Sequence, residues 1–290
     1  MWLIVGSNGQ LGRCLQDVLV QNNIEYFATT HRDLDVSDSH AVSQFVSTGS
    51  FNTIVNCAAW TAVDDAEEHE SEALRVNFDG PRNLAIAAKN TASRFIHIST
   101  DYVFSGDAST PYTVQTPTAP MNAYGRTKLK GDEAVLEIGD GQFPVIRTAW
   151  LYSRYGKNFA KTMTGRALQG LPVGVVDDQV GQPTMAGDLA YLIFQVATAE
   201  TFPPVIHGTN SGQASWFDFA QAIYESLGSD SSLVSPVTSK QFPTKAKRPS
   251  YSVLDHSELM DTSIPEMRDW LHALRDEITH IKHYVKNEMK

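Results

Sequence analysis

The chain has 290 residues, of which 42% are hydrophobic and 19% are charged, a composition that excludes a disordered or fibrous protein. A formal net charge of −10 argues against a nucleic-acid backbone or an anionic membrane surface as the main partner, so a small molecule is expected. Two cysteines are too few for a disulfide framework, and no run approaches the ~20 apolar residues of a membrane span, which favours a cytoplasmic protein.

Apolar runs alternate with helix-like stretches through the first half of the chain. Strands are expected at residues 2–5, 25–30, 53–59, 94–99 and 144–147. Helices are expected at residues 11–21, 41–46, 70–89 and 124–136. Because parallel strands need crossover connections, this alternation predicts an α/β fold with a doubly wound, mostly parallel sheet and helices on both faces.

The alternation breaks after Trp150. Helices are then expected at residues 158–169, 185–199, 216–227 and 265–289, and extended segments at 172–176 and 205–208. The Ser-, Pro- and Lys-rich stretch 229–250 predicts an irregular loop. We therefore expect residues 1–150, rejoined by about 185–208, to form one domain. Residues 151–290 should form a smaller, interleaved C-terminal lobe that closes over it.

A glycine-rich turn joins the first predicted strand to the first helix. Its sequence has the pattern G-x-x-G-x-x-G and reads Gly6-Ser7-Asn8-Gly9-Gln10-Leu11-Gly12. Glycine at these positions permits a tight turn, close approach of a pyrophosphate to the backbone and close helix–sheet packing. The helix start offers free N–H groups to phosphates. Because a strand precedes the turn and a helix follows it, the pattern predicts a dinucleotide-binding domain, with a purely structural turn as the alternative.

The residues after the second strand bear on which dinucleotide binds. NAD-specific sites often hold the ribose 2′-hydroxyl there with an acidic side chain. This chain instead has Thr29-Thr30-His31-Arg32, and acids follow only at Asp33 and Asp35. Arg32 can pair with a 2′-phosphate, so NADPH is expected and NADH stays possible, with a solvated surface arginine as the alternative. Asp35 and Val36 are better placed to meet the adenine edge than the ribose.

Tyr124 and Lys128 stand four residues apart within a predicted helix. This spacing places both side chains on one face of the helix, one turn apart. A phenol can protonate a developing alkoxide, and a neighbouring ammonium lowers the pKa of the phenol toward neutrality. The lysine can also hold the ribose of a nicotinamide cofactor. Because such pairs are common on helix surfaces, the pair alone does not identify a catalytic site.

Two further residues fall where this chemistry needs them. Thr100 follows the strand 94–99, at the carboxyl end where open α/β sheets place their ligands. Its hydroxyl can hydrogen-bond a substrate carbonyl oxygen beside Tyr124, which gives two donors where negative charge develops. Asn77 can anchor a water or a backbone carbonyl behind Lys128, with a helix-surface amide as the alternative. The glycine turn, Thr100 and the Tyr124/Lys128 pair together predict a catalytic site.

Longer motifs carry a resemblance to a known family. They lie at residues 6–12, 56–64, 99–104, 122–128, 147–152, 178–184 and 248–255. With them, nearly the whole chain resembles the extended short-chain dehydrogenase/reductase superfamily, and within it the dTDP-4-dehydrorhamnose reductases. The resemblance implies a Rossmann-type fold with a smaller C-terminal substrate-binding lobe. It also implies NAD(P)H-dependent reduction of the 4-keto group of dTDP-4-dehydro-L-rhamnose to give dTDP-L-rhamnose, a nucleotide sugar.

The resemblance implies roles for single residues. Tyr124 would be the general acid. Lys128 would lower the pKa of Tyr124 and bind the nicotinamide ribose, and Thr100 would hydrogen-bond the substrate carbonyl. Besides the glycine loop, the cofactor contacts would include Arg32, Asp35, Val36, Ala58, Ala59, Asn77, Tyr124 and Lys128. The substrate contacts would come from Val63, Thr100, Asp101, Trp150, Asn158 and Arg248.

Three of these substrate contacts have a physical rationale or an alternative. The indole face of Trp150 can cover a sugar ring, with a buried core tryptophan as the alternative. Asn158 and Arg248 would meet the nucleotide diphosphate, and arginine fits phosphate well. Surface arginines are also common, so Arg248 can instead be solvated.

One departure from the family concerns magnesium. Members that dimerise around magnesium use an acidic residue two positions after the last glycine of the loop. That position here is Cys14, which is neutral and a poor magnesium ligand. We therefore do not expect a magnesium-bridged dimer, and a homodimer of another kind stays open.

Two alternative functions follow from the same pattern. The first is another nucleotide-sugar reductase, epimerase or dehydratase of the superfamily. Epimerases and dehydratases recycle a tightly held cofactor, so stoichiometric NADPH consumption separates them from a reductase. The second is a cofactor-binding regulatory subunit that resembles the one of methionine adenosyltransferase. The presence of Thr100, Tyr124 and Lys128 argues against it, because a regulatory chain needs no proton donor.

Overall fold

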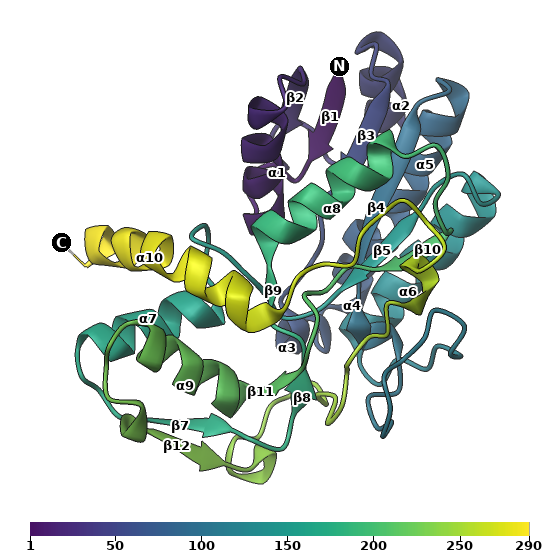
Figure 1. Cartoon of the computed structure of the whole chain (residues 1–290). Helices are drawn as coiled ribbons and strands as arrows, with labels where there is room; N and C mark the ends of the chain where they lie inside the picture. Colours follow the sequence, from purple (N-terminus) through teal and green to yellow (C-terminus); the bar gives the residue numbers. More distant parts are fainter. Residues whose placement is uncertain (290) are drawn as a thin grey trace.

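Six parallel strands form the central sheet of the protein, in the order β10-β5-β4-β3-β1-β2 (Figure 1). The structure, a computed structural model, describes residues 1–289. The strands are β1 (Trp2–Val5), β2 (Tyr26–Thr29), β3 (Thr53–Asn56), β4 (Arg94–Thr100), β5 (Val145–Thr148) and β10 (Val205–His207). Every neighbouring pair in this sheet is parallel, which confirms the predicted doubly wound α/β fold.

Helices cover both faces of the sheet. On one face lie α1 (Gln10–Gln21) and α8 (Ala186–Thr198), and on the other α2 (Ser39–Thr48), α5 (Gly80–Asn90) and α6 (Ala123–Gly139). Successive residues of a strand point to opposite faces. In β1, Trp2 and Ile4 therefore pack with α1 and α8, whereas Leu3 and Val5 pack on the other side. From the second half of the chain, β10 pairs with β5 at one edge of this sheet, and α8 packs on the same face as α1.

Elements from the second half of the chain form a smaller lobe below the sheet in Figure 1. It contains α7 (Phe159–Leu168), α9 (Trp216–Ser226), α10 (Trp270–Glu288) and the parallel pair β7 (Val173–Val176) and β12 (Val234–Val237). Its own core is built around buried aromatic and aliphatic side chains such as Tyr152, Phe219 and Leu274. Two short strand pairs lie between the lobes: β6 (Leu151–Tyr152) with β9 (Thr184–Met185), and β8 (Val180–Gly181) with β11 (Ala214–Ser215).

The helix predicted over 70–89 is confirmed as one unbroken helical stretch, but a π-helical turn lies within it. A short α3 (Val63–Ala66) precedes α4 (Glu70–Leu74), and a π-helical turn (Arg75–Asp79) separates α4 from α5. Pro81 has no N–H, so it cannot donate to the carbonyl of Asn77 four residues earlier. Gly131 of α6 also packs against that carbonyl, since a Cβ at Gly131 would lie 2.1 Å from the Asn77 oxygen. Both features favour a widened turn at this point.

Three other boundaries differ from the expectations. The strand predicted over 53–59 ends at Asn56, whose side chain accepts a hydrogen bond from the Ala58 N–H and so turns the chain. The final helix starts at Trp270 rather than at 265, because Asp269 caps its first amides. The stretch 229–250 is not wholly irregular, since it contributes β12 as a partner of β7.

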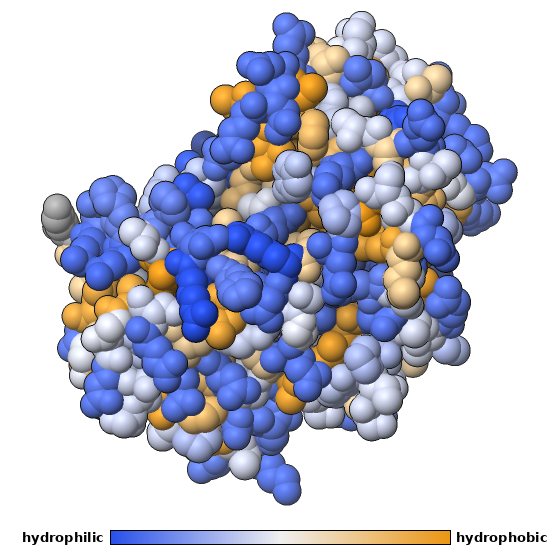
Figure 2. Space-filling view, viewed as in Figure 1, coloured by the Kyte–Doolittle hydropathy of each residue, from blue (hydrophilic) through white to orange (hydrophobic). Residues whose placement is uncertain are grey.

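The surface in the view of Figure 2 is mostly hydrophilic, and apolar residues form separate small patches on it. Patches of this size are ordinary for a globular protein. Among residues 1–289, no helix combines the length and the apolar character needed to cross a membrane.

Candidate active site

The glycine loop owes its shape to two close approaches. Gly6 has a φ of +80°, and a Cβ there would lie 2.6 Å from the backbone nitrogen of Ala58. A Cβ on Gly12 would lie 2.6 Å from the carbonyl oxygen of Gly6. Both positions therefore require glycine. Helix α1 follows directly, and no side chain of the described residues caps its first amides, so they stay available to an anion such as a pyrophosphate.

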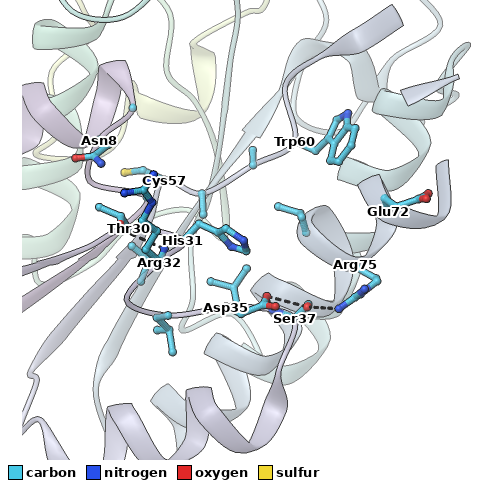
Figure 3. Close-up of a pocket in the computed structure, with 18 residues that line it drawn as sticks. Asn8, Thr30, His31, Arg32, Asp35, Ser37, Cys57, Trp60, Glu72 and Arg75 are labelled. Carbon is cyan, nitrogen blue, oxygen red and sulfur yellow. Dashed lines mark hydrogen bonds between the residues drawn. The ribbon is translucent and has the colours of Figure 1, made fainter. Parts of the chain in front are cut away.

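A cavity of about 990 Å³ opens beside this loop (Figure 3). Most of the predicted cofactor contacts line it, namely Gly6, Asn8, Gly9, Arg32, Asp35, Val36, Ala58 and Ala59. Among the other lining residues, which the sequence analysis did not assign to the cofactor, are Cys57, Trp60 and Arg75. They lack a distinctive spacing, although Cys57 and Trp60 flank the predicted pair 58–59.

Polar contacts fix the acidic side of the cavity. Ser37 donates two hydrogen bonds to the Asp35 carboxylate, from its N–H at 2.9 Å and from its hydroxyl at 2.8 Å. These bonds lower the pKa of Asp35 and keep it ionised. Arg75 in turn donates to the Ser37 hydroxyl at 3.0 Å, as Figure 3 shows. Asp33 accepts from Thr30 and so caps its own turn, whereas the exposed Arg32 side chain lines the cavity.

Three residues predicted to contact the cofactor make contacts within the protein instead. Leu11 is a core residue and 6% exposed. The side-chain oxygen of Gln10 accepts hydrogen bonds from the second lobe rather than facing the cavity. Asn77 accepts from the Trp60 N–H at 2.9 Å and donates to the Thr127 hydroxyl at 3.1 Å. It also donates to the Trp60 carbonyl at 3.2 Å and is 1% exposed, so it anchors a backbone carbonyl between the chain after β3 and α6 and is not a helix-surface amide. A water held behind Lys128 stays a prediction.

The proposed catalytic residues come together where β4 ends and α6 begins. Thr100 is the last residue of β4, and Tyr124 and Lys128 lie on the first turns of α6. Asn122 caps this helix by accepting from the Gly125 N–H at 2.8 Å. A Cβ on Gly125 would lie 2.2 Å from the Tyr102 carbonyl, so α6 packs closely against the segment that follows β4. The close packing brings the Tyr124 ring next to Tyr102, with 5.6 Å between the centroids.

The electrostatics of this pair differ from the expectation that Lys128 would bring the pKa of the Tyr124 phenol toward neutrality. Burial raises the pKa of Tyr124, and Asp101 and Asp132 raise it further, while Thr100 acts in the opposite direction. The Lys128 Nζ instead donates to the Ile98 carbonyl at 2.6 Å. Burial lowers the pKa of Lys128 to about 8. Tyr124 thus holds its proton at neutral pH, as a donor must.

Asp101 and Arg248 lie on two sides of this site. Asp101 is 3% exposed, its Oδ1 accepts from the Thr100 hydroxyl at 3.0 Å, and its Oδ2 has no hydrogen-bond partner among the described residues. Burial raises the pKa of Asp101 to about 6. Arg248 forms a two-pronged ion pair with Asp64, at 2.6 and 3.1 Å, next to Val63 at the start of α3.

Trp150 does not offer a free indole face. Its ring stacks on Trp216 with 3.7 Å between the centroids and 9° between the planes. Gly181 packs on the ring as well, since a Cβ there would lie 2.6 Å from Cε2 and 2.8 Å from both Nε1 and Cζ2. Because Trp216 already covers one face, Gly181 occupies the other. The expectation that this face covers a sugar ring is therefore wrong, and the indole can meet a ligand only with an edge.

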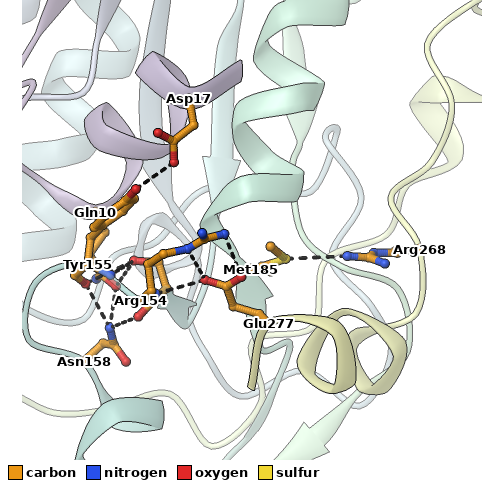
Figure 4. A network of polar contacts seen from close by, with 9 residues as sticks. Gln10, Asp17, Arg154, Tyr155, Asn158, Met185, Arg268 and Glu277 are labelled. Atoms are coloured by element: carbon orange, nitrogen blue, oxygen red, sulfur yellow. Dashed lines mark hydrogen bonds and ion pairs between the residues drawn. The ribbon is translucent and has the colours of Figure 1, made fainter. Parts of the chain in front are cut away.

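Asn158 and Arg248 are not brought together. Asn158 caps α7 by accepting from the Lys161 N–H at 3.0 Å, and it donates to the Gln10 side chain at 2.8 Å. It belongs to the polar network of Figure 4, in which Arg154 pairs with Glu277 and Tyr155 donates to Asp17. The expected contact of Asn158 with the nucleotide diphosphate conflicts with these bonds. Residues of this network come from segments far apart in the sequence, so no spacing could reveal it.

Comparison with known proteins places this site in a family. Residues 1–283 match the RmlD substrate binding domain family. A probable dTDP-4,6-dihydroxy-2-methyloxan-3-one 4-ketoreductase from Streptomyces antibioticus is 44% identical over 276 residues, covering 95% of this chain and 93% of that protein.

Two solved structures are similar over nearly the whole chain. A dTDP-4-dehydrorhamnose reductase from Clostridium acetobutylicum has a TM-score of 0.92 at 41% identity, over 96% of this chain and 98% of that one. A dTDP-4-dehydrorhamnose reductase from Bacillus anthracis in complex with NADP has a TM-score of 0.91 at 34% identity, over the same shares. With its fold, its glycine loop and the Thr100, Tyr124 and Lys128 cluster, this chain belongs to the RmlD substrate binding domain family.

Proposed function

We propose that this protein is an NADPH-dependent reductase that converts the 4-keto group of dTDP-4-dehydro-L-rhamnose into the hydroxyl of dTDP-L-rhamnose. The observation that carries the proposal is the meeting of Thr100, Tyr124 and Lys128 at the carboxyl end of β4. This end of a parallel sheet is where α/β proteins bind ligands. The family relationship and the NADP complex of the Bacillus anthracis relative support the choice of reaction and cofactor.

The residues have separate tasks in the reaction. Tyr124 donates its phenolic proton to the substrate oxygen as negative charge develops there. Thr100 offers a second hydrogen bond to the same oxygen, and two donors fixed in advance stabilise that charge. Lys128 holds the nicotinamide ribose and returns a proton to Tyr124. The cofactor supplies the hydride when it is bound.

The lining of the cavity supports a dinucleotide at this position. The unused first amides of α1 suit the pyrophosphate, and the ionised Asp35 and the adjacent Val36 suit the adenine edge. Arg32 follows the second strand of the sheet, where the ribose 2′ position of a dinucleotide is expected, and its guanidinium can pair with a 2′-phosphate. We therefore propose NADPH as the preferred cofactor, with NADH as a weaker one.

This preference makes a prediction for Arg32. Arg32→Ala should raise the KM for NADPH about tenfold and leave the KM for NADH nearly unchanged, because hydrogen bonds between charged groups contribute ~1.5–3 kcal/mol and NADH has no 2′-phosphate. Steady-state kinetics with both cofactors measures the effect. Arg13 provides the matched control, since it is also exposed but lies over Tyr155 at 4.7 Å and does not line the cavity. An equal loss with both cofactors would contradict the assignment.

The sugar nucleotide is proposed to bind between the two lobes. The Asp101 Oδ2, which lacks a partner among the described residues, can accept a hydrogen bond from a sugar hydroxyl. Val63 and an edge of Trp150 would contact the sugar, and Arg248 would turn from Asp64 to the diphosphate. On this proposal, residues 1–150 with 185–208 hold the cofactor and the smaller lobe holds the nucleotide sugar.

Magnesium does not fit the position at which related proteins use an acid. Cys14 is 5% exposed, and burial raises its pKa to about 12, so its thiol is uncharged. An uncharged thiol is a poor ligand for a cation that prefers oxygen donors. We therefore propose that activity, and any homodimer, are independent of magnesium.

A chelator checks the magnesium proposal directly. Excess EDTA should leave the rate of NADPH oxidation and the sedimentation coefficient unchanged, and Cys14→Ser should do the same. A loss of activity or of mass on chelation, restored by magnesium, would contradict it.

A second candidate function is the reduction of a different dTDP-linked keto sugar. The Streptomyces antibioticus relative is named for a different dTDP-linked 4-keto substrate. A Streptomyces niveus relative, 42% identical over 94% of this chain, is named dTDP-4-keto-6-deoxy-D-glucose reductase. The chemistry at Thr100, Tyr124 and Lys128 would be the same, and only the sugar contacts would differ. The two free cysteines, Cys14 and Cys57, fit the reducing cytoplasm as the place of either reaction.

Loss of NADPH absorbance with a panel of substrates tests both candidates. The panel contains dTDP-4-dehydro-L-rhamnose, dTDP-4-keto-6-deoxy-D-glucose and the corresponding UDP-linked ketone. The first proposal expects the highest kcat/KM with dTDP-4-dehydro-L-rhamnose. A higher value with dTDP-4-keto-6-deoxy-D-glucose would favour the second. No oxidation with any member, despite tight NADPH binding, would favour the regulatory alternative.

A further inference from the structure

A buried polar cluster surrounds Lys128. Apart from Lys128, its residues have no role in the chemistry described above. Its residues are Asn56 at the end of β3, His97 of β4, Lys128 and Asp132 of α6, and Arg147 of β5. Each of the five is at most 4% exposed. Buried polar groups at this density are costly unless they serve a purpose.

The hydrogen bonds of Asn56 define the protonation state of His97. The Ala58 N–H can only donate, so the Asn56 atom that it contacts at 3.1 Å is the amide oxygen. The amide nitrogen of Asn56 therefore faces the Nδ1 of His97, at 3.2 Å, and donates to it. An Nδ1 that accepts carries no proton, so the neutral ring has its proton on Nε2. Burial also lowers the pKa of His97 well below its usual value, which keeps the ring neutral.

The protonated Nε2 of His97 faces Lys128. The two nitrogens are 3.4 Å apart, and Lys128 already donates one hydrogen bond to the Ile98 carbonyl at 2.6 Å. An ammonium has no lone pair, so it cannot accept from the Nε2–H, and two N–H groups that face each other repel. An uncharged amine has one lone pair and can accept. The geometry of His97 therefore matches the amine form of Lys128.

Other charged and titratable groups around Lys128 also affect whether it is an ammonium or an amine. Burial disfavours the ammonium and Asp132 favours it. The nearby Cys57 thiol is uncharged at neutral pH, because burial raises its pKa to about 12. Arg147 holds Asp132 at 3.3 Å, and Asp132 Oδ1 is 3.8 Å from the His97 Nε2, beyond hydrogen-bond range. Tyr124 lies one turn before Lys128 on α6. Among these groups, His97 is the only hydrogen-bond donor directed at the lysine nitrogen within the described part of the chain.

We propose that His97 is a positioning residue which, held by Asn56 as the Nε2–H tautomer, stabilises the amine form of Lys128 and so sets the pH at which Lys128 exchanges its proton. The inference rests on the proposed function in one respect, the role of Lys128 as the proton partner of Tyr124. It adds two residues, Asn56 and His97, that act through Lys128 and touch neither substrate nor cofactor.

The proton balance of a turnover gives this arrangement its use. Tyr124 loses its proton to the substrate oxygen and becomes a phenolate. The Lys128 ammonium returns a proton to the phenolate and becomes an amine, which accepts the His97 Nε2–H. Solvent then restores the ammonium, so each turnover consumes one proton. A Lys128 ammonium whose pKa lies below the ordinary value of 10.5 gives its proton to the phenolate more readily than an unperturbed lysine does.

Nitrogen-15 NMR of the intact protein, labelled in its histidine rings, tests the tautomer without any assay of activity. His97 should show a protonated Nε2 and an unprotonated Nδ1 at pH 7. His207 supplies an internal control of opposite sense, because its Nδ1 lies 2.8 Å from the Asp255 carbonyl and must donate. Both rings are buried, so exposure does not distinguish them. A protonated Nδ1 on His97, or an imidazolium, would overturn the proposal.

A variant of Asn56 tests the effect on Lys128. Asn56→Asp keeps an oxygen for the Ala58 N–H but turns the second atom into an acceptor, so His97 should carry its proton on Nδ1 and accept from the Lys128 ammonium. The midpoint at which Lys128 loses its proton, followed by its carbon-13 ε resonance, should rise by about one pH unit, a tenfold change in proton affinity. The pH at which kcat falls to half on the alkaline side should rise by the same amount.

Removal of the histidine separates this effect from simple charge. In a His97→Leu background, Asn56→Asp should no longer move the Lys128 midpoint, because the ring that transmits the change is gone. An equal rise with and without His97 would show a direct charge effect and overturn the proposal. The NMR midpoints are independent of turnover. A protein that reduces no keto sugar but shows these shifts would refute the proposed function and support this inference.

Discussion

Tyr124→Phe should lower the kcat for NADPH oxidation by roughly 10²–10⁴-fold and leave the affinity for NADPH nearly unchanged. The phenol is the only proton donor that we assign to the substrate oxygen, and Thr100 offers a hydrogen bond but not an acidic proton. The ring itself stays, so its packing against Tyr102 is kept. Stopped-flow absorbance under single-turnover conditions measures the chemical step directly.

Tyr102→Phe is the matched control for this variant. Its ring centroid lies 5.6 Å from that of Tyr124, and burial raises the pKa of both phenols, but Tyr102 is not part of the proposed chemistry. Loss of the Tyr102 hydroxyl should change kcat by less than a few-fold. A Tyr124→Phe enzyme that works at the normal rate, or an equal loss in both variants, would refute the role of Tyr124.

Arg154→Met should lower the free energy of unfolding by roughly 3 kcal/mol, because it leaves a buried carboxylate without its partner. Glu277 is 2% exposed, and its two oxygens accept from the Arg154 guanidinium at 2.9 and 3.0 Å (Figure 4). Within residues 1–289, only the backbone N–H of Arg154 would remain as a donor to the Glu277 carboxylate. Urea unfolding followed by circular dichroism gives the free energy.

Two controls identify the cause of that loss. The double variant Arg154→Met/Glu277→Met removes both charges and should recover most of the stability. Lys161→Met breaks the ion pair with Glu288, whose side chain is 61% exposed, and should cost less than about 1 kcal/mol. A double variant as unstable as the single one would mean that packing, and not the uncompensated charge, accounts for the loss.

Much of the fold follows from local patterns in the sequence. The strand Trp2–Val5 is a continuous apolar run that is fully buried, and such runs are typical of parallel strands covered on both faces. The π-helical turn inside the helix over 70–89 was not predictable, because it depends on the approach of Gly131 from another helix as well as on Pro81. β12 was missed because its partner β7 is distant in the sequence, and the composition of 229–250 resembles that of a loop.

Some parts of the candidate site could also be predicted from the sequence, and others could not. The glycine loop and the Thr100, Tyr124 and Lys128 cluster were predictable, because an open α/β fold brings the carboxyl ends of its strands together. The stack of Trp150 between Trp216 and Gly181 was not, because it joins three separate segments. Asn158 resembled a ligand contact but serves as a helix cap, a role that depends only on the backbone that follows it.

The most direct test of the central claim uses NADPH that carries deuterium at the transferable position of carbon 4. On incubation with dTDP-4-dehydro-L-rhamnose, we expect one deuterium at carbon 4 of the sugar product for each NADPH oxidised, as measured by mass spectrometry and proton NMR. A sugar product without deuterium, or conversion of the sugar with no net oxidation of NADPH, would contradict a reductase and indicate an epimerase or dehydratase of the same fold.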